Sequence, residues 1–360
     1  MSLRDLRRHV GQLAIVGFPG HTIPAELKRV AAEFDLGGVI YFSRNIAEPA
    51  QVSDLSREAA DLAQDIPLWI SVDQEGGRVA RLRAPFTEWP AMATLGRAGG
   101  TALAEAFGVA LAAELRAVGI NLDYTPVLDI HTNPANPVIG DRAFGTTAQV
   151  VAEIGAALVR TLQRQGVVAC GKHFPGHGDT ATDSHFELPL VEQPPERLRD
   201  TEFLPFRAAI EAGLHTIMTA HVLVPSLDES RPATLSPHIV TDILKRELGF
   251  EGVVISDDLG MKAVAATWPL PDAMVASLVA GCDAVLLCNS TLEEQVEALE
   301  AVIHAAEDGR LSLTRIDDAL KRQRRVKTLF APVMRPGVFL PDVIGREAHQ
   351  AVARQMADLL

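Results

Sequence analysis

Short apolar runs rich in valine and isoleucine alternate with longer amphipathic stretches along this chain of 360 residues. Most of these runs are too uniformly apolar to alternate between a buried face and a wet face. Parallel strands that are covered on both faces have this pattern. The pattern predicts strands at Gln12–Phe18, Gly37–Phe42, Pro67–Asp73, Asn121–Leu128, Gly166–His173, His215–His221, Gly252–Asp257 and Asp283–Leu287.

Patterns of helical period fill most of the gaps between the predicted strands. Two of these stretches are followed directly by a glycine, Gly119 or Gly166, as is common where a helix ends in left-handed backbone. Eight strand–helix units predict an α/β fold, specifically a (β/α)8 TIM barrel. An open, doubly wound sheet is the structural alternative. The predicted helices are Thr101–Val118, Val150–Gln165, Leu204–Ala212, His238–Leu248 and Leu292–Glu307.

No stretch of the chain has the composition of a linker between domains. We therefore expect residues 1–330 to form one barrel domain and residues 331–360 to add a loop and a helix packed on that barrel. Leu313–Leu329 and Ile344–Leu360 have helical patterns, whereas Ala331–Phe339 contains two prolines and predicts a loop.

The chain carries a formal net charge of -13. This excess of acidic side chains argues against a partner that is a nucleic acid or an anionic membrane surface, because both require basic protein surface. The first apolar run is broken by Gly17 and Pro19 and is too short for a signal peptide, and no run reaches the roughly 18 apolar residues of a membrane helix. We expect a cytoplasmic monomer whose three cysteines, Cys170, Cys282 and Cys288, are buried and reduced.

Polar residues gather directly after the predicted strands. The carboxyl ends of the strands are where a TIM barrel builds its active site. A single aspartate at a strand end is as often a helix cap as a catalyst, but clusters after five strands are harder to explain by capping. The clusters are Asp73–Arg78, Asp129 with Asp141-Arg142, Lys172–Asp179 with Asp183–His185, His221, and Ser256–Asp258.

The histidines after the fifth run allow two interpretations. Pro175 and the glycines beside it exclude a helix, so His173 and His177 do not form a helical metal-binding pair. The loop is nevertheless rich in side chains that ligate metals. Alternatively, Asp183 fixes the tautomer of His185 and supports acid/base catalysis. The residues alone leave both interpretations open.

Asp257 and Asp258 present a second open choice. Adjacent residues of a strand point to opposite faces, so only one of the two carboxylates is expected to face the mouth of the barrel. A carboxylate at this place is suited to attack an anomeric carbon, and it is equally suited to cap the helix predicted at Met261–Ala266.

Four motifs in the same order resemble those of glycoside hydrolase family 3, and more narrowly its single-domain β-N-acetylglucosaminidases of NagZ type. One difference is Gly260, where the family usually has serine. The glutamate that larger members supply from a second domain has no counterpart here, which agrees with a histidine as the acid/base. The motifs are Asp73–Val79, Gly140–Gly145, Lys172–Asp179 with Asp183–His185, and Ser256–Met261.

The resemblance implies a role for each matching residue and needs no metal or cofactor. Asp257 would be the nucleophile, and His185 would be the acid/base with Asp183 as its dyad partner. The sugar would be bound by Asp73, Arg81, Arg142, Lys172 and His173.

The activity implied is the retaining removal of a terminal, β-linked N-acetylglucosamine. The substrate would be a small carbohydrate or muropeptide that carries this sugar on 1,6-anhydro-N-acetylmuramic acid, in peptidoglycan recycling. Three alternatives stay open: a β-glucosidase or phosphorolytic enzyme of the same family, a barrel that binds sugars without turnover, and a metal-dependent hydrolase. The last would use His173, His177, Asp179, His185 and His221.

Overall fold

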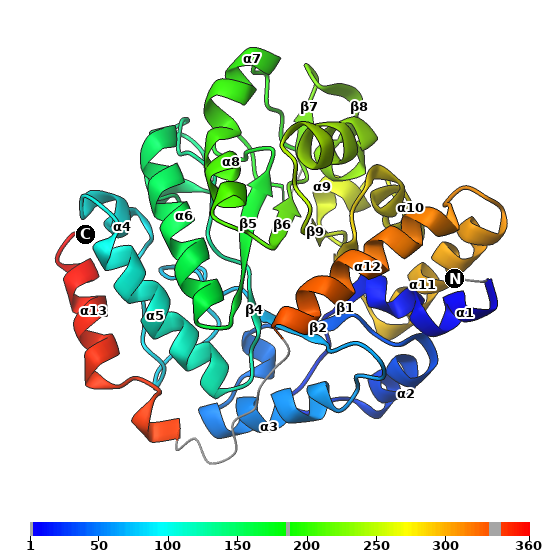
Figure 1. Ribbon diagram of the computed structural model, residues 1–360, viewed down its shortest axis with the longest axis horizontal. Coiled ribbons are helices and arrows are strands. Elements are labelled where there is room, and N and C mark those ends of the chain that lie inside the picture. Colours follow the sequence, from blue (N-terminus) through cyan, green and yellow to red (C-terminus); the bar gives the residue numbers. More distant parts are fainter. Residues whose placement is uncertain (1–2, 185–187, 331–339) are drawn as a thin grey trace.

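Eight parallel strands form a closed barrel at the centre of the computed structural model, which describes residues 3–184, 188–330 and 340–360 (Figure 1). Each predicted run overlaps one barrel strand, so the predicted TIM barrel is confirmed and the open-sheet alternative is wrong. Around the barrel the order is β1-β10-β9-β6-β5-β4-β3-β2. The strands are β1 (Ala14–Val16), β2 (Gly38–Tyr41), β3 (Trp69–Val72), β4 (Leu122–Asp123), β5 (Val168–Phe174), β6 (Thr216–Thr219), β9 (Val253–Asp258) and β10 (Ala284–Leu287).

β4 is much shorter than the run that predicts it. Pro126 follows the strand closely and has no N–H to donate to a neighbour, so a regular ladder cannot continue through it. The backbone beyond Pro126 still bonds to β5 irregularly, as when Leu128 N–H donates to the Lys172 carbonyl at 2.6 Å. The apolar run therefore stays beside the barrel wall without being a long strand.

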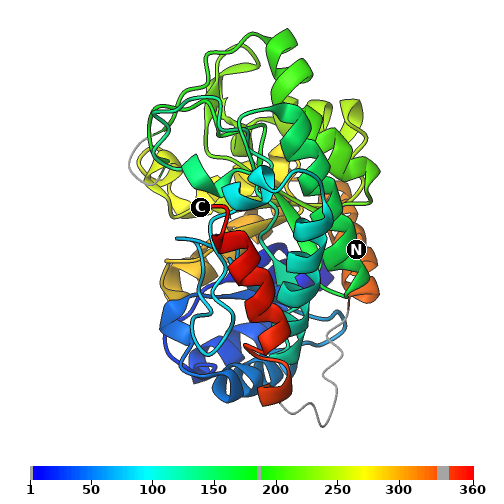
Figure 2. The same ribbon diagram turned by 90° about the vertical axis from the view of Figure 1, so that its left-hand side faces the viewer.

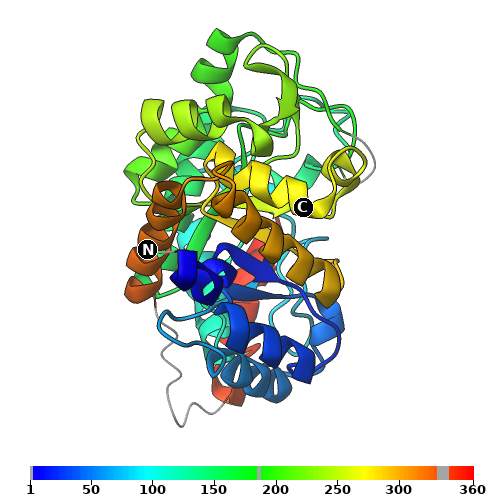
Figure 3. The same ribbon diagram turned by 90° about the vertical axis from the view of Figure 1, so that its right-hand side faces the viewer.

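Helices surround the barrel, and the predicted ones occur within about three residues of their expected bounds (Figures 1 and 3). Gly166 follows α6 with a φ of 84°, a left-handed conformation that suits glycine. Among the described residues, no helix combines the length and apolar content needed to cross a bilayer. The helices are α1 (Leu3–His9), α2 (Ala25–Phe34), α3 (Pro49–Ala60), α4 (Ala93–Arg97), α5 (Ala102–Ala117), α6 (Ala148–Arg164), α7 (Pro195–Arg197), α8 (Leu204–Glu211), α9 (Lys262–Ala265), α10 (Leu270–Ala280), α11 (Leu292–Glu307), α12 (Leu313–Leu329) and α13 (Glu347–Ala357), with a π-helix at His238–Glu247.

A small hairpin interrupts the barrel pattern after β6. Its strands are β7 (Leu223–Val224) and β8 (Asp228–Pro232), which pair antiparallel and lie with α7 at one end of the molecule (Figure 1). The sequence pattern did not predict them. Residues 229–231 in β8 are exposed and polar, so the strand lacks the apolar alternation that would reveal it.

α12 closes the end of the barrel opposite the predicted site. Gln323 accepts a bond from the Trp69 indole at 3.1 Å and donates to the Asp283 carbonyl at 2.8 Å. Lys327 Nζ donates to the carbonyl of Gly37 and to Gln12 Oε1, both at 2.7 Å. These partners stand at or just before the amino ends of the strands, so this end of the barrel is filled and structural.

The last described helix, α13, packs beside α5 (Figure 2). Glu114 of α5 is buried and accepts bonds from His349 Nδ1 at 2.8 Å and from Gly345 N–H at 2.9 Å. The same carboxylate accepts bonds from the N–H and hydroxyl of Thr87. The predicted loop Ala331–Phe339 lies outside the described residues, and the division of the chain at residue 330 stays a prediction.

All three cysteines are buried and free of disulfides, as expected from their apolar surroundings. Burial raises the pKa of Cys170 and Cys282 to about 12, because a thiolate is poorly solvated in the interior. These thiols are therefore protonated and unreactive at neutral pH.

Candidate active site

A cavity of about 170 Å³ lies at the carboxyl ends of the barrel strands. The polar residues at its wall come from the ends of β3, β5 and β9 and from the loops after β3, β4, β5 and β10, so residues far apart in the sequence are brought together. Six of the predicted site positions line it: Asp73, Arg81, Arg142, Lys172, His173 and Asp257.

Two acidic and two basic side chains form one ion-pair cluster in the cavity wall. Lys172 Nζ lies 2.8 Å from Asp73 Oδ1 and 2.6 Å from Glu75 Oε1. Arg142 binds Glu75 through both arms of its guanidinium, at 2.9 and 2.8 Å. Each of the predicted sugar-binding residues Asp73, Arg142 and Lys172 is therefore held by a charged neighbour.

Glu75 is the centre of this cluster and was not singled out from the sequence, although it stands in the motif Asp73–Arg78. Its side chain is fully buried. Burial alone raises the pKa of Glu75, but the charges of Arg142 and Lys172 outweigh burial and hold that pKa well below its usual range. Burial likewise lowers the pKa of Lys172, whereas Asp73 and Glu75 raise it above its usual value. Glu75 and Lys172 are thus both ionised at neutral pH.

Arg81 completes this side of the cavity. Its Nη2 lies 3.6 Å from Asp73 Oδ2, and its guanidinium lies over the Phe42 ring at 5.4 Å from the centroid. Arg44 lies over the same ring at 4.6 Å and donates to the Cys288 carbonyl at 2.7 Å. Phe42 therefore forms an aromatic wall whose position is fixed by two cations.

His173 is oriented by a carboxylate that the cavity does not contain. Asp129 is buried, and its Oδ2 accepts the His173 Nδ1–H at 2.6 Å, while its Oδ1 accepts the His177 backbone N–H at 2.6 Å. Burial raises the pKa of Asp129, but the neighbouring His173 and the bonds it receives bring the pKa below its ordinary value. The ionised Asp129 leaves His173 Nε2 as the nitrogen available to a ligand.

The loop after β5 is tied to the cavity by His177. Its ring contacts Thr180 Oγ1 through Nδ1 at 2.8 Å and Ser184 Oγ through Nε2 at 3.2 Å. Burial lowers the pKa of His177 to about 4, so the ring is neutral at neutral pH and one nitrogen accepts a hydrogen bond. Ser184 lines the cavity beside the predicted dyad residue Asp183, which is partly exposed.

The other predicted dyad residue, His185, lies outside the described residues. Where the structure does describe the chain, no three His, Cys, Asp or Glu side chains are arranged to hold a metal ion. The metal-dependent alternative would need His173, His177 and His221. Protein groups contact both ring nitrogens of His177 and of His221, and Asp129 contacts Nδ1 of His173.

The two neighbouring aspartates at the end of β9 have different surroundings. Asp258 is buried, and its carboxylate accepts bonds from Cys288 N–H at 3.0 Å, Gly260 N–H at 3.2 Å and Asn289 Nδ2 at 3.1 Å. Asp257 is partly exposed, and its Oδ1 accepts the Asp258 N–H at 2.8 Å. Of the two, Asp257 is the carboxylate with room for a ligand.

The charge states of the pair also differ. Burial raises the pKa of Asp258, which the bonds from Cys288 and Gly260 only partly offset. Burial acts on Asp257 too, but the rings of His221 and His173 lead the effects that bring its pKa below the ordinary value. Asp257 is thus an ionised carboxylate at the cavity. Nor does it cap a helix, because the residue before α9 is Met261, which makes no side-chain capping bond.

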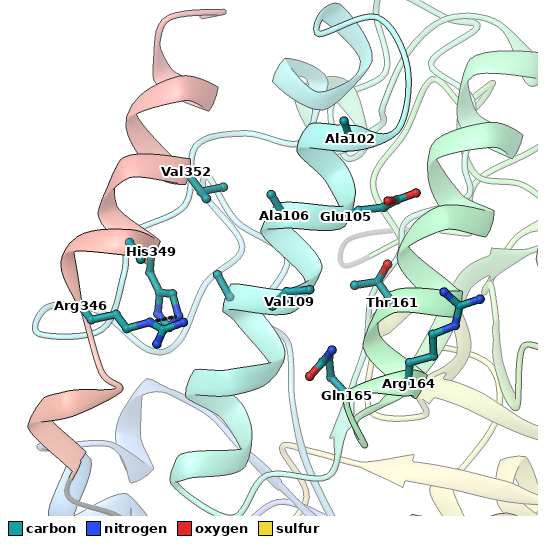
Figure 4. A pocket seen from close by; sticks show the side chains of 12 residues that line it. Ala102, Glu105, Ala106, Val109, Thr161, Arg164, Gln165, Arg346, His349 and Val352 are labelled. Carbon is teal, nitrogen blue, oxygen red and sulfur yellow. Dashed lines mark hydrogen bonds between the residues drawn. The ribbon is translucent and has the colours of Figure 1, made fainter.

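A second hollow, of about 550 Å³, lies on the outside of the barrel over α5, α6 and α13 (Figure 4). Its wall includes the pair in which Arg346 Nε donates to His349 Nε2 at 2.8 Å. None of the residues predicted for the site lines it. The chemistry predicted from the sequence therefore belongs to the smaller cavity in the barrel mouth.

Comparison with known proteins agrees with the geometry. Residues 5–328 match the model of the glycosyl hydrolase family 3 N-terminal domain. The chain belongs to glycosyl hydrolase family 3. The resemblance drawn from the four motifs is thereby confirmed, and the matched region includes the whole barrel and its polar cluster.

Relatives within family 3 share most of the length of this chain. A β-hexosaminidase of Nitrosomonas eutropha is 42% identical over 299 residues, which cover 81% of this chain and 85% of that protein. The structure of a family 3 β-N-acetylglucosaminidase from Paenibacillus sp. FPU-7 has a TM-score of 0.95 and 41% identity, covering 98% of this chain and 68% of that one. NagZ from Neisseria gonorrhoeae has a TM-score of 0.80 and 32% identity, and 98% of each chain is covered.

Proposed function

We propose that this family 3 protein is an exo-acting, retaining β-N-acetylhexosaminidase that removes a terminal β-linked N-acetylglucosamine. The observation that carries the proposal is the partly exposed, ionised carboxylate of Asp257. It lies at a cavity lined by charged and aromatic side chains, which are suited to bind a sugar. The names of the relatives, β-hexosaminidase and β-N-acetylglucosaminidase, support the same class.

The size of the cavity favours a single sugar ring. At about 170 Å³ it is smaller than the roughly 300–1,000 Å³ that is common for larger ligands, so a run of several sugars would not fit inside. Asp73, Lys172 and Arg142 would bind hydroxyl groups of this ring. Ionised partners hold these three side chains in place before a substrate arrives, which reduces the ordering required on binding.

The proposed reaction has two steps. In the first, Asp257 attacks C1, the bond from C1 to the leaving oxygen breaks, and His185 gives its proton to that oxygen. In the second, water attacks C1, gives a proton to His185, and the bond to Asp257 breaks to restore the carboxylate. The roles of His185 and of its partner Asp183 rest on the resemblance to the family.

The natural substrate proposed is N-acetylglucosamine on 1,6-anhydro-N-acetylmuramic acid, with or without a stem peptide, in the cytoplasmic recycling of peptidoglycan. Family resemblance is the support for this finer assignment. A neutral histidine base does not repel an anionic acceptor, so phosphate is a candidate to replace water in the second step. Product analysis in phosphate buffer distinguishes the free sugar from a sugar phosphate.

A panel of 4-nitrophenyl glycosides tests the proposal. We expect release of nitrophenol from the β-N-acetylglucosaminide, little from the β-glucoside, and a product whose first-formed anomer is β by NMR. Asp257→Ala should reduce this turnover by at least about 10⁴-fold, because the nucleophile is removed. Full activity of Asp257→Ala, or an α product, would contradict the mechanism.

A further inference from the structure

The nucleophilic carboxylate is oriented by the backbone of its neighbour. Asp258 N–H donates to Asp257 Oδ1 at 2.8 Å. The carbonyl oxygen of Asp258 in turn accepts bonds from His221 Nε2 and from Met261 N–H, both at 3.0 Å. The orientation of the Asp257 carboxylate therefore depends on the groups that fix Asp258, and one of them is an imidazole ring.

His221 itself has no access to a substrate. Its side chain is fully buried, and it follows the end of β6 in the barrel wall. Burial lowers the pKa of His221, although the nearby Asp257 carboxylate raises it in part, so the ring is neutral at neutral pH. A neutral ring carries one N–H. Because a carbonyl oxygen only accepts hydrogen bonds, that N–H must be on Nε2.

Thr234 is the partner of the other ring nitrogen of His221, Nδ1. Its Oγ1 lies 2.8 Å from His221 Nδ1, and the Thr219 hydroxyl lies 2.9 Å from the same oxygen. With Nδ1 unprotonated, Thr234 donates to the ring, and Thr219 donates to Thr234. The Ala220 carbonyl, 2.9 Å from Thr234, competes for the single hydroxyl proton, but only the bond to Nδ1 satisfies the neutral ring.

The hairpin that the sequence did not predict explains how Thr234 reaches this place. Thr234 lies in a short helical segment, Ala233–Leu235, directly after β8. Ala233 N–H donates to the Val222 carbonyl at 2.8 Å, which holds the end of the hairpin against the residue that follows His221. After the hairpin of β7 and β8, the chain therefore comes back beside the imidazole ring of His221.

We propose that His221 is a positioning residue for the nucleophile: its Nε2–H, in the tautomer that the Thr234 hydroxyl complements, fixes the backbone of Asp258 and so aims the Asp257 carboxylate at C1. The inference rests on the proposed function, in which Asp257 attacks the sugar. Sugar binding belongs to side chains on other strands, such as Lys172 and Asp73. Loss of the His221 bond therefore lowers the rate of attack and leaves sugar binding unchanged.

Four variants test this role. His221→Leu removes the N–H, and His221→Gln offers an amide N–H in its place. Thr234→Val removes the hydroxyl that donates to Nδ1 in this tautomer. Thr216→Val is the matched control, because Thr216 is also buried, lies on β6 and donates to a backbone carbonyl, that of Ala169 at 2.9 Å. Its hydroxyl bonds to β5, and Thr216 pairs in register with Val253, well before Asp258 on β9.

The measurements are KM and kcat on 4-nitrophenyl β-N-acetylglucosaminide, and the rate at which a 5-fluoro glycosyl fluoride of the same sugar labels the protein. In that labelling the bond from C1 to fluorine breaks, fluoride leaves, and an ester forms to Asp257, detected by mass. Labelling counts only folded active sites and reports the attack step alone. Thermal unfolding of each variant gives its stability.

We expect His221→Leu to lower kcat and the labelling rate about 30-fold or more, with KM within about threefold, because a small misplacement of a reacting group costs about that much. His221→Gln should recover most of the loss, and Thr234→Val should show an intermediate one. Thr216→Val should lose stability only. If His221→Leu does not fold, Thr234→Val decides.

The inference is overturned if the labelling rates of His221→Leu and Thr234→Val stay within twofold of that of Thr216→Val. It is also overturned if KM rises and the labelling rate at saturation does not fall, since His221 would then serve binding. Failure of the proposed function looks different. In that case the unmodified protein neither turns over the glycoside nor forms the ester on Asp257.

Discussion

Lys172 and Glu75 form an ion pair with 2.6 Å between Nζ and Oε1, and both side chains are withdrawn from solvent. The pair holds a predicted sugar-binding lysine in a charged state inside the barrel mouth. Glu75 meets Arg142 in the same way, so one buried carboxylate positions two cations.

Replacing this carboxylate should therefore affect both binding and stability. We expect Glu75→Gln to raise KM at least about tenfold and to lower the free energy of unfolding by about 3–5 kcal/mol, because it leaves the buried Arg142 without its carboxylate partner and Lys172 with Asp73 alone. Urea unfolding and steady-state kinetics measure the two effects. Glu247→Gln is the control, since Glu247 pairs with Arg199 at the surface and should cost less than about 1 kcal/mol. Equal losses in both variants would contradict the assignment.

Acid catalysis by His185 predicts a dependence on the leaving group. His185→Ala should slow cleavage of a 4-nitrophenyl glycoside far less than cleavage of an alkyl glycoside or disaccharide, because only the poor leaving groups need a proton. The contrast should approach the roughly 10²–10⁴-fold that general acid catalysis usually contributes. Kinetics on a series of leaving groups measure it, and a uniform loss across the series would count against the role.

His177 predicts a change of stability with pH. Its pKa falls from 6.5 to about 4 on folding, so the unfolded chain binds more protons between these values. Stability is therefore fully present above about pH 6.5 and decreases as the pH falls toward 4, by about 3 kcal/mol in total.

Denaturant unfolding at about pH 4.5, 5.5, 6.5 and 7.5 measures this effect, because these pH values cover most of the interval between the two pKa values of His177. The slope should be shallower in His177→Gln, which cannot titrate. His304→Gln provides the comparison, because His304 is exposed and should leave the slope unchanged. Identical slopes in the wild type and His177→Gln would refute the prediction.

Two glycines near the site should differ in whether they tolerate a side chain. A Cβ at Gly178 would lie 1.7 Å from the Ile130 carbonyl oxygen, so Gly178→Ala requires the backbone to move and should cost about 1–3 kcal/mol or more. A Cβ at Gly260 would lie 3.4 Å from Asp258 Oδ1, which is ordinary contact.

Gly260→Ser, which introduces the residue usual in the family, should therefore keep the melting temperature and leave kcat within about twofold. Thermal unfolding and turnover of both variants check the pair. Loss of activity in Gly260→Ser without loss of stability would contradict this prediction. The glycine would then be needed for activity although the site has room for a side chain.

The sequence by itself determined the barrel and the place of its chemistry. Runs such as Gly37–Phe42 are apolar on both faces, and only a strand covered on both sides buries them, so they predict a parallel sheet between helices. Eight strand–helix units favoured a closed barrel over an open sheet, and the structure shows the closed one. The polar residues after these runs, such as Asp73 and Lys172, had to meet because the carboxyl ends of barrel strands converge. The sequence pattern did not predict the hairpin of β7 and β8, because its strands are short and partly polar.

Only the tertiary structure gives the physical difference between residues that the local sequence pattern treats alike. Asp257 and Asp258 are identical neighbours, and they differ because the Asp258 carboxylate accepts a bond from the backbone of Cys288, directly after β10, whereas Asp257 lines the cavity. Glu75 and His221 gained their places in the same way, through contacts with residues 67 and 37 positions away. Such contacts depend on the register and closure of the barrel, and the local pattern of a single chain segment carries no information about them.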